Sequence, residues 1–198
     1  MKKLRIALTG GIGVGKSTVA SLFQQHGAEV VSGDELGRQV LEGDITVRAA
    51  IIMRYGDEVL NSDSSLNRKA IADRVFADPQ QSQWLTSLTF PGIYSRWQSA
   101  FEASSSRVVV FDASLIFEWN IQQEFDLIVV VAADAAIALE RASMKFTKAD
   151  LERRATSQLS VEHKIANADC VIWNNDSPDV LSHEVEKFWN SNIQPLIA

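Results

Sequence analysis

The sequence has few of the residues that mark several protein classes, with one cysteine, three histidines and four prolines in 198 residues. A single cysteine, Cys170, cannot form an internal disulfide, and no Cys/His spacing fits a zinc site. The longest apolar run, residues 127–133, is far shorter than the roughly 20 residues that cross a bilayer. These absences favour a reducing compartment, so we expect a cytoplasmic protein without a membrane partner.

Basic residues are also in deficit, because 19 Lys and Arg stand against 25 Asp and Glu, for a net charge of −6. Affinity for nucleic acid comes chiefly from Lys and Arg that neutralise phosphates, so we expect no nucleic-acid partner. A small anionic ligand is still compatible with this charge, since it needs only a local group of donors. A chain of this length can bury a substantial core, in one domain that carries an insertion.

Five apolar stretches rich in β-branched residues predict strands. They lack polar alternation and are separated by helical patterns, which favours a parallel sheet covered on both faces. The expected fold class is therefore α/β, a three-layer sandwich with a five-stranded parallel sheet. The predicted strands are residues 4–9, 29–32, 108–111, 127–131 and 170–173.

The interval between the second and third strands is far longer than the single helix that a parallel crossover needs. Helical patterns fill it, at residues 36–41, 47–55, 68–76, 84–88 and 93–101. We therefore expect a core of residues 1–33 and 105–198, a helical insertion of residues 34–104, and a charged lid at residues 141–158.

Three helix ends carry recognisable signals. Asp78 before Pro79, and Ser177 before Pro178, each predict an N-cap followed by proline at the first helical position. Gly27 predicts the end of the helix that follows Gly15.

The most specific motif is GGIGVGKS at residues 10–17, which fits G-x-x-x-x-G-K-[ST]. It follows an apolar strand and opens an amphipathic helix, the context that a phosphate-binding loop (P-loop) requires. Backbone N–H groups of such a loop surround phosphate oxygens, Lys16 reaches the β- and γ-phosphates, and the Ser17 hydroxyl binds Mg²⁺. The motif predicts a P-loop NTPase fold and a nucleoside triphosphate ligand. The expected ATP-binding residues here are Gly11, Gly13, Val14, Gly15, Lys16, Ser17 and Thr18.

Two aspartates follow predicted strands. Because ligands sit outside the carboxyl ends of parallel strands, Asp34 would face the same crevice as the P-loop and accept a proton from an attacking hydroxyl. An N-cap for the following helix is the alternative. Asp112 resembles an acid that supports Mg²⁺ through water, with a turn at the strand end as its alternative.

Taken in order along the chain, these motifs and several shorter ones resemble the dephospho-coenzyme A kinase family. The loop alone is shared with many unrelated NTPases, whereas the ordered set is far more specific. Its pieces are residues 8–20, Asp34 with Arg38, Tyr55-Gly56, Asp63, residues 66–68 and 75–79, Asp112 with Leu115, Phe117 and Glu118, then Gln158, residues 168–169 and 171–172, and Asn174.

The resemblance implies transfer of the ATP γ-phosphoryl group to the ribose 3′-hydroxyl of dephospho-coenzyme A, giving coenzyme A and ADP, with Mg²⁺. By the same analogy, Asp34 is the base or orienting group, so the expected catalytic residues are Asp34 and the P-loop Lys16. Arg38 contacts the acceptor, the helical insertion holds the pantetheine part, and Asn174 lies near the adenine of ATP.

The chain departs from the family pattern at five places. Four are single residues: Ser32, Ser64, Phe90 before the Pro91 of an expected helix start, and Ser114 in place of proline. The fifth is the lid, which is shorter by about two residues and lacks the family's arginine. Either Arg141 or Lys145 substitutes for it, or the lid closes less effectively.

Two other functions stay open on the sequence alone. One is a P-loop kinase of another nucleotide or small alcohol, because such kinases share the phosphate site and differ in the acceptor pocket. The other is a regulator that binds ATP or a coenzyme A precursor with weakened catalysis, which the altered lid suggests and the intact Lys16, Ser17 and Asp34 count against. The oligomeric state is equally open.

Overall fold

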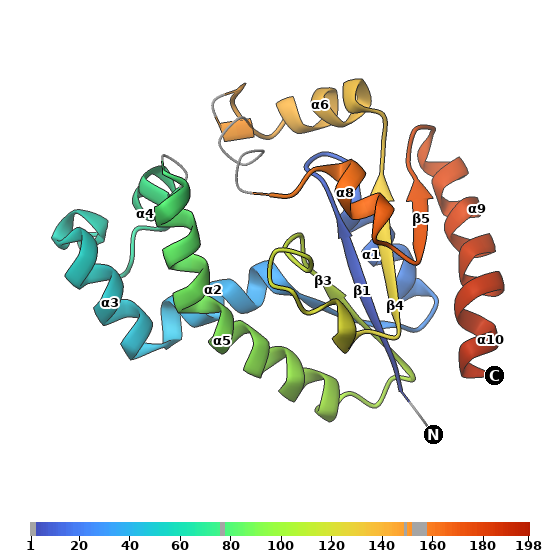
Figure 1. The fold of residues 1–198 in the computed structure, drawn as a ribbon, viewed down its shortest axis with the longest axis horizontal. Coiled ribbons are helices and arrows are strands. Elements are labelled where there is room, and N and C mark those ends of the chain that lie inside the picture. Colours follow the sequence, from blue (N-terminus) through green and yellow to red (C-terminus); the bar gives the residue numbers. More distant parts are fainter. Residues whose placement is uncertain (1–2, 76–77, 149, 152–157) are drawn as a thin grey trace. The chain divides into compact units, whose positions relative to one another are not determined.

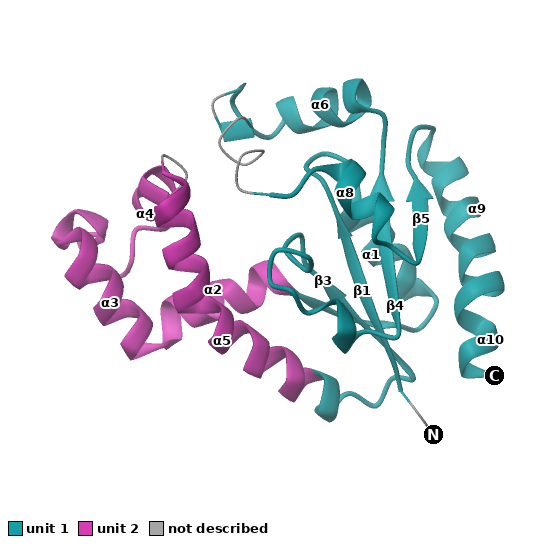
Figure 2. Cartoon of the chain, viewed as in Figure 1, with its two compact units in different colours: residues 1–32, 101–198 teal, residues 33–100 magenta. Residues whose placement is uncertain are grey.

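The computed structural model describes residues 3–75, 78–148, 150–151 and 158–198 (Figure 1). The chain forms two compact units, one of residues 1–32 and 101–198 and one of residues 33–100 (Figure 2). The first unit contains the sheet, and the described residues of the second are mainly helical. No helix among the described residues is both long and apolar enough to cross a membrane.

The sheet of the first unit has five parallel strands in the order β2-β3-β1-β4-β5. All five predicted strands are confirmed, three of them one residue longer than expected. The P-loop strand β1 is central, so its carboxyl end is flanked by those of β3 and β4. The strands are β1 (Leu4–Gly10), β2 (Glu29–Ser32), β3 (Val108–Asp112), β4 (Leu127–Ala132) and β5 (Cys170–Trp173).

Both faces of the sheet are buried, as the lack of polar alternation predicts. Side chains alternate between the faces of a strand. Ile6 and Leu8 of β1 join a core with α1 (Lys16–Gln25) and α9 (Pro178–Phe188), and all of their surface is buried. Ala7 points to the opposite face and is equally buried. The parallel α/β sandwich is therefore confirmed.

The predicted helix ends of the first unit are also confirmed. Gly27 follows α1 with φ +91°, a left-handed conformation that glycine adopts without a Cβ penalty. The Ser177 side chain accepts a hydrogen bond from Val180 N at 3.4 Å, and Pro178 begins α9. Further helical segments among the described residues of this unit are α6 (Ala135–Ser143), α8 (Val161–Ala166), α10 (Gln194–Ile197), a π-helical turn (Trp189–Ile193) and a 3₁₀ turn (Gln122–Glu124).

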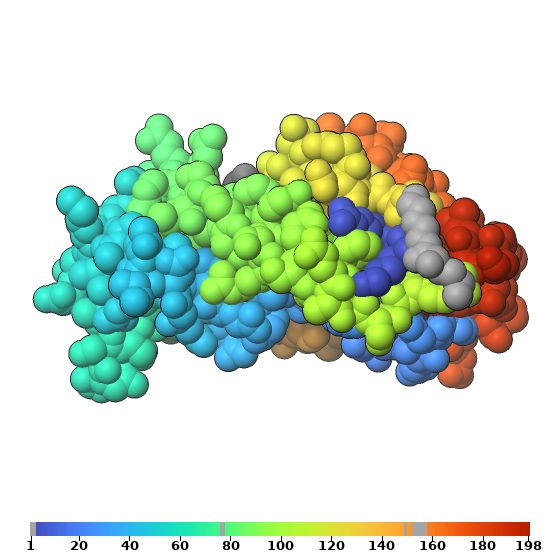
Figure 3. All heavy atoms as spheres, turned by 90° about the horizontal axis from the view of Figure 1, so that it is seen from below, coloured from blue at the N-terminus to red at the C-terminus, as the bar shows by residue number. Residues whose placement is uncertain are grey.

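The described residues of the second unit are mainly helical, and this unit is coloured light blue to yellow-green in the space-filling view of Figure 3. Asp44 caps α3 by accepting hydrogen bonds from Thr46 N at 2.9 Å and Val47 N at 3.1 Å. The Asp78 side chain accepts from Gln80 N at 2.9 Å, which confirms the predicted cap. The helices are α2 (Gly33–Gly43), α3 (Ile45–Tyr55), α4 (Arg68–Val75) and α5 (Pro79–Ala103), with a 3₁₀ turn (Asp57–Val59).

The prediction of a helix start at Pro91 is wrong. The patterns at residues 84–88 and 93–101 belong to one 25-residue helix, α5, which contains Pro91. Proline has no backbone N–H, so it costs a helix one hydrogen bond and is unfavourable inside it. Here the helix extends far enough on both sides of Pro91 to tolerate this loss. Thr89 and Ile93, two residues to either side of Pro91, are buried, so packing holds the helix together there.

Ile6 offers a test of the core. Replacing Ile6 with alanine is expected to lower the free energy of unfolding by about 2–5 kcal/mol, because the surrounding strands cannot close the cavity. The milder Ile6→Val change is expected to cost about 0.5–1.5 kcal/mol. Urea unfolding followed by circular dichroism measures both. Equal and small losses would contradict a close-packed sheet at this position.

Candidate active site

The P-loop lies between the end of β1 at Gly10 and the start of α1 at Lys16. Gly13 and Gly15 have φ values of +77° and +87°, in the left-handed region that favours glycine. A Cβ on Gly13 would overlap Ala138 O, and one on Gly15 would overlap the side-chain amide of Asn174. The two glycines are thus required both by the backbone conformation and by the closeness of neighbouring segments.

Asn174 supports the loop from the end of β5. Its side-chain Nδ2 donates a hydrogen bond to Val14 O at 2.9 Å, and its backbone N–H bonds Ala132 O at 2.8 Å. Asn174 is buried, so this bond is shielded from water. The family resemblance implies that Asn174 lies near the adenine of ATP; in the structure its side chain also fixes the P-loop backbone.

Lys16 and Asp112 form an ion pair at the carboxyl end of the sheet. Lys16 Nζ donates to Asp112 Oδ1, and both side chains are largely buried, with 16% and 13% of their surface exposed. The register explains the contact, because Asp112 pairs with Leu8 of β1 on one side and with Ser32 of β2 on the other. Sequence reasoning named both residues, and the fold brings them together.

The same edge of the sheet offers oxygen ligands that fit Mg²⁺. Ser17 and Thr18 are exposed in the first turn of α1, where the helix dipole favours anions. Mg²⁺ is usually held by one or two protein oxygens, substrate phosphates and water. The Ser17 hydroxyl and the Asp112 carboxylate are oxygen donors of that kind. Among the described residues there is no cluster of three or more His, Cys, Asp or Glu that would form an all-protein cage.

Asp34 and Arg38 both lie on α2 of the second unit. The helix begins at Gly33, so exposed Asp34 is within the first turn instead of capping it from outside. Residues four apart lie on one helix face, which places Asp34 and Arg38 on the same side of α2.

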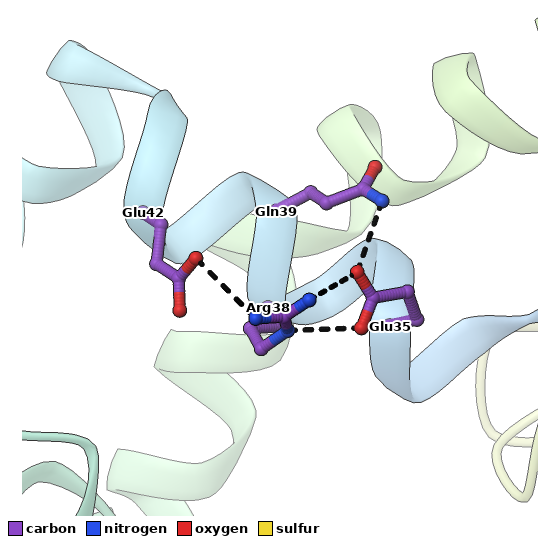
Figure 4. Close-up of polar contacts among 4 residues, drawn as sticks. All are labelled: Glu35, Arg38, Gln39 and Glu42. Carbon is purple, nitrogen blue, oxygen red and sulfur yellow. Dashed lines mark hydrogen bonds and ion pairs between the residues drawn. The ribbon is translucent and has the colours of Figure 1, made fainter.

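The Arg38 guanidinium is held by acidic neighbours on its own helix (Figure 4). Its Nε and Nη2 donate to Glu35 at 2.9 and 2.5 Å, and Nη1 lies 3.9 Å from Glu42 Oε2. These hydrogen bonds lower the pKa of Glu35 and raise that of Arg38. Arg38 is 43% exposed, so a ligand anion has access to the guanidinium.

Of the two candidates for the missing lid arginine, Arg141 is already engaged. Its Nη1 donates to Asn174 O at 2.7 Å, which ties α6 to the segment after β5. Lys145, in the turn after α6, is exposed. Residues 149 and 152–157 of the predicted lid, and with them Arg153 and Arg154, lie outside the described residues.

Sequence reasoning missed Lys164, which is completely buried in α8. Its ammonium group donates to Ser114 O at 2.5 Å and lies 3.0 Å from Glu118 Oε1. Burial lowers the pKa of Lys164, and the neighbouring Glu118 opposes that shift. A lysine among the charged and polar residues of a short helix gives no sequence signal of burial. Of the pair, the sequence analysis named only Glu118, as one of the residues that carry the family resemblance.

The strand, loop and helix around Lys16, set at the carboxyl end of a five-stranded parallel sheet, define a P-loop kinase fold. Solved structures agree. A Thermus thermophilus protein, TT1252, matches with a TM-score of 0.81 at 23% identity over 97% of this chain and 99% of that one. A dephospho-CoA kinase from Campylobacter jejuni matches with a TM-score of 0.68 at 21% identity, over 94% and 95%.

The sequence comparisons are more specific than the fold. The sequence profile of the dephospho-CoA kinase family matches residues 4–179, and the chain belongs to this family. The dephospho-CoA kinase of Syntrophotalea carbinolica is 38% identical over 88% of this chain and 85% of that one, and that of Escherichia coli K12 33% over 96% and 93%. A dephospho-CoA kinase of Mycolicibacterium paratuberculosis is 36% identical over 97% of this chain. The match spans 48% of the length of that relative.

Gly15→Ala tests the loop geometry. We expect Mg·ATP binding to weaken at least about tenfold, because a left-handed φ costs an L-residue about 1–2 kcal/mol and the methyl group meets Asn174. Isothermal titration calorimetry measures the affinity. Gly43→Ala is the matched control, since a Cβ there meets nothing within 4 Å. Wild-type affinity in Gly15→Ala would refute the requirement for glycine.

Proposed function

We propose that this chain is a cytoplasmic enzyme that transfers the γ-phosphoryl group of ATP to the ribose 3′-hydroxyl of dephospho-coenzyme A. The products are coenzyme A and ADP. The observation that carries the proposal is the Lys16–Asp112 pair beside the P-loop, in a chain of the dephospho-CoA kinase family. The names of the relatives at 33–38% identity support the same acceptor.

The reaction needs a new bond between the 3′-oxygen and the γ-phosphorus, while the bond from that phosphorus to the β–γ bridging oxygen breaks. Asp34 takes or orients the proton of the attacking hydroxyl. Lys16 leaves Asp112 and binds the β- and γ-phosphate oxygens as charge moves onto them. Ser17 and Asp112 would hold Mg²⁺, which neutralises phosphate charge when bound.

Arg38 suits the acceptor because it is exposed and stands one turn from Asp34. The acceptor carries phosphate groups, and a guanidinium binds phosphate oxygens with paired hydrogen bonds. The bond to Glu35 holds the Arg38 side chain in one conformation before substrate arrives. Arg38 would thus position the acceptor for Asp34.

Asp34→Asn tests the role of the base. We expect kcat to fall by about 10²–10⁴-fold with little change in KM for ATP, because general-base catalysis contributes about that much. A coupled assay for ADP release, with and without dephospho-coenzyme A, measures the rates, and Asp179→Asn at an exposed position of α9 is the control. Full turnover in Asp34→Asn would remove this role. ADP release only with another alcohol in an acceptor panel would reassign the substrate.

Lys145 is the residue that we propose for the missing lid arginine, because Arg141 is bonded to Asn174 O. A lysine acts as a point charge, whereas arginine binds phosphate with two hydrogen bonds. Lys145→Arg is therefore expected to raise kcat several-fold, and Lys145→Ala to lower it, in the same assay. Lys187→Arg, on the exposed face of α9, controls for an added guanidinium. Unchanged kcat in both Lys145 variants would exclude a role in the lid.

A further inference from the structure

Among the residues that the structure describes, Lys164 is the one charged residue that is buried, with none of its surface exposed. An ammonium ion loses several kcal/mol of hydration when buried, and a pair of apolar residues often serves stability as well as a buried ion pair. Stability alone is therefore a weak reason for a lysine at this position. Its contacts suggest another one.

The ammonium group joins three segments of the first unit. It donates to Ser114 O, in the loop that follows β3 two residues after Asp112. The same carbonyl accepts a hydrogen bond from Thr9 Oγ1 at 3.3 Å, and Thr9 is the residue before the P-loop motif. Lys164 thus connects α8 to the two strand ends that carry the P-loop and Asp112.

Glu118, the anionic partner of Lys164, also contacts the segment before α8. Its Oε1 accepts a hydrogen bond from Leu159 N at 2.8 Å, one residue after the predicted lid range ends. At the start of α8, Val161 lies against the P-loop, since a Cβ on Gly11 would come within 2.7 Å of its Cγ2. Leu159 and the loop after β3 therefore meet at this pair, and α8 also contacts the P-loop through Val161.

The charge of Lys16 also acts on Lys164. Burial is the main cause of the lowered pKa of Lys164, the positive charge of Lys16 lowers that pKa further, and the Glu118 carboxylate opposes the shift. With 0% of its side chain exposed, Lys164 has no access to substrate. It can act only through the residues that it holds.

We propose that Lys164 is a positioning residue for phosphoryl transfer, whose bonds to Ser114 and Glu118 fix the loop after Asp112 against the P-loop strand and hold the chain at Leu159. The kinetic test of this proposal rests on the proposed function. The expected fixing of the loop after Asp112 does not depend on it. A displacement of about 1 Å at a catalytic group can cost about 100-fold in rate. Lys164 would therefore affect turnover more than affinity.

The test compares Lys164→Met, the double variant Lys164→Met/Glu118→Gln and the exposed control Lys187→Met. The single variant leaves the Glu118 carboxylate without its cation, whereas the double variant removes both charges and is expected to keep near wild-type stability in urea unfolding. We expect kcat with dephospho-coenzyme A to fall about 10–100-fold in both, with KM for ATP nearly unchanged and Lys187→Met at wild-type rates. A stable double variant with more than half of the wild-type kcat would overturn the proposal.

Hydrogen–deuterium exchange separates this proposal from the proposed function. In the double variant, backbone amides of residues 113–118 are expected to exchange faster than in the wild type, while those of α9 stay the same. Wild-type protein without activity on dephospho-coenzyme A would refute the function and leave this comparison standing. Equal protection of residues 113–118 in the wild type and the double variant would overturn the positioning role.

Discussion

The ion pair between Lys16 and Asp112 is the interaction on which the rest of the candidate site depends. It joins the helix after β1 to the end of β3, and it exists because the two strands are neighbours in register, with Leu8 opposite Asp112. In the proposed reaction, a nucleoside triphosphate would replace the carboxylate as the partner of Lys16. The freed Asp112 carboxylate would then be available to hold Mg²⁺, so one exchange of partners would prepare both groups.

That exchange requires a P-loop whose backbone keeps its shape while its N–H groups are open to phosphate. The loop therefore takes its support from other segments of the first unit. Asn174 holds the Val14 carbonyl, Arg141 holds the Asn174 carbonyl in turn, and Ala138 of α6 lies directly against Gly13. Substitutions far from the P-loop in sequence would therefore alter phosphate binding.

The sequence was enough to predict the five strands and the P-loop and to single out Asp112, because buried parallel strands and phosphate loops have strong local patterns. It was not enough for features that depend on tertiary packing. The continuity of α5 through Pro91 is set by burial on either side, which a local proline rule does not include. The burial of Lys164 and the loop-supporting bond of Asn174 likewise arise from contacts between distant segments.

Lys16 and Arg38, the two cations that we propose bind the substrates, share one property: each already has a carboxylate partner. Arg38 is bonded to Glu35 and Lys16 to Asp112, so in the proposed reaction a substrate anion would exchange one charge-assisted hydrogen bond for another and would gain little ground-state affinity. Interactions that strengthen only as charge develops on the transferred phosphoryl group then contribute to rate. Lys164 differs, because its ammonium group is fully buried against Glu118 and is not accessible to a substrate. The Lys164–Glu118 pair is a fixed part of the scaffold, whereas Lys16 and Arg38 would exchange their carboxylate partners for substrate anions.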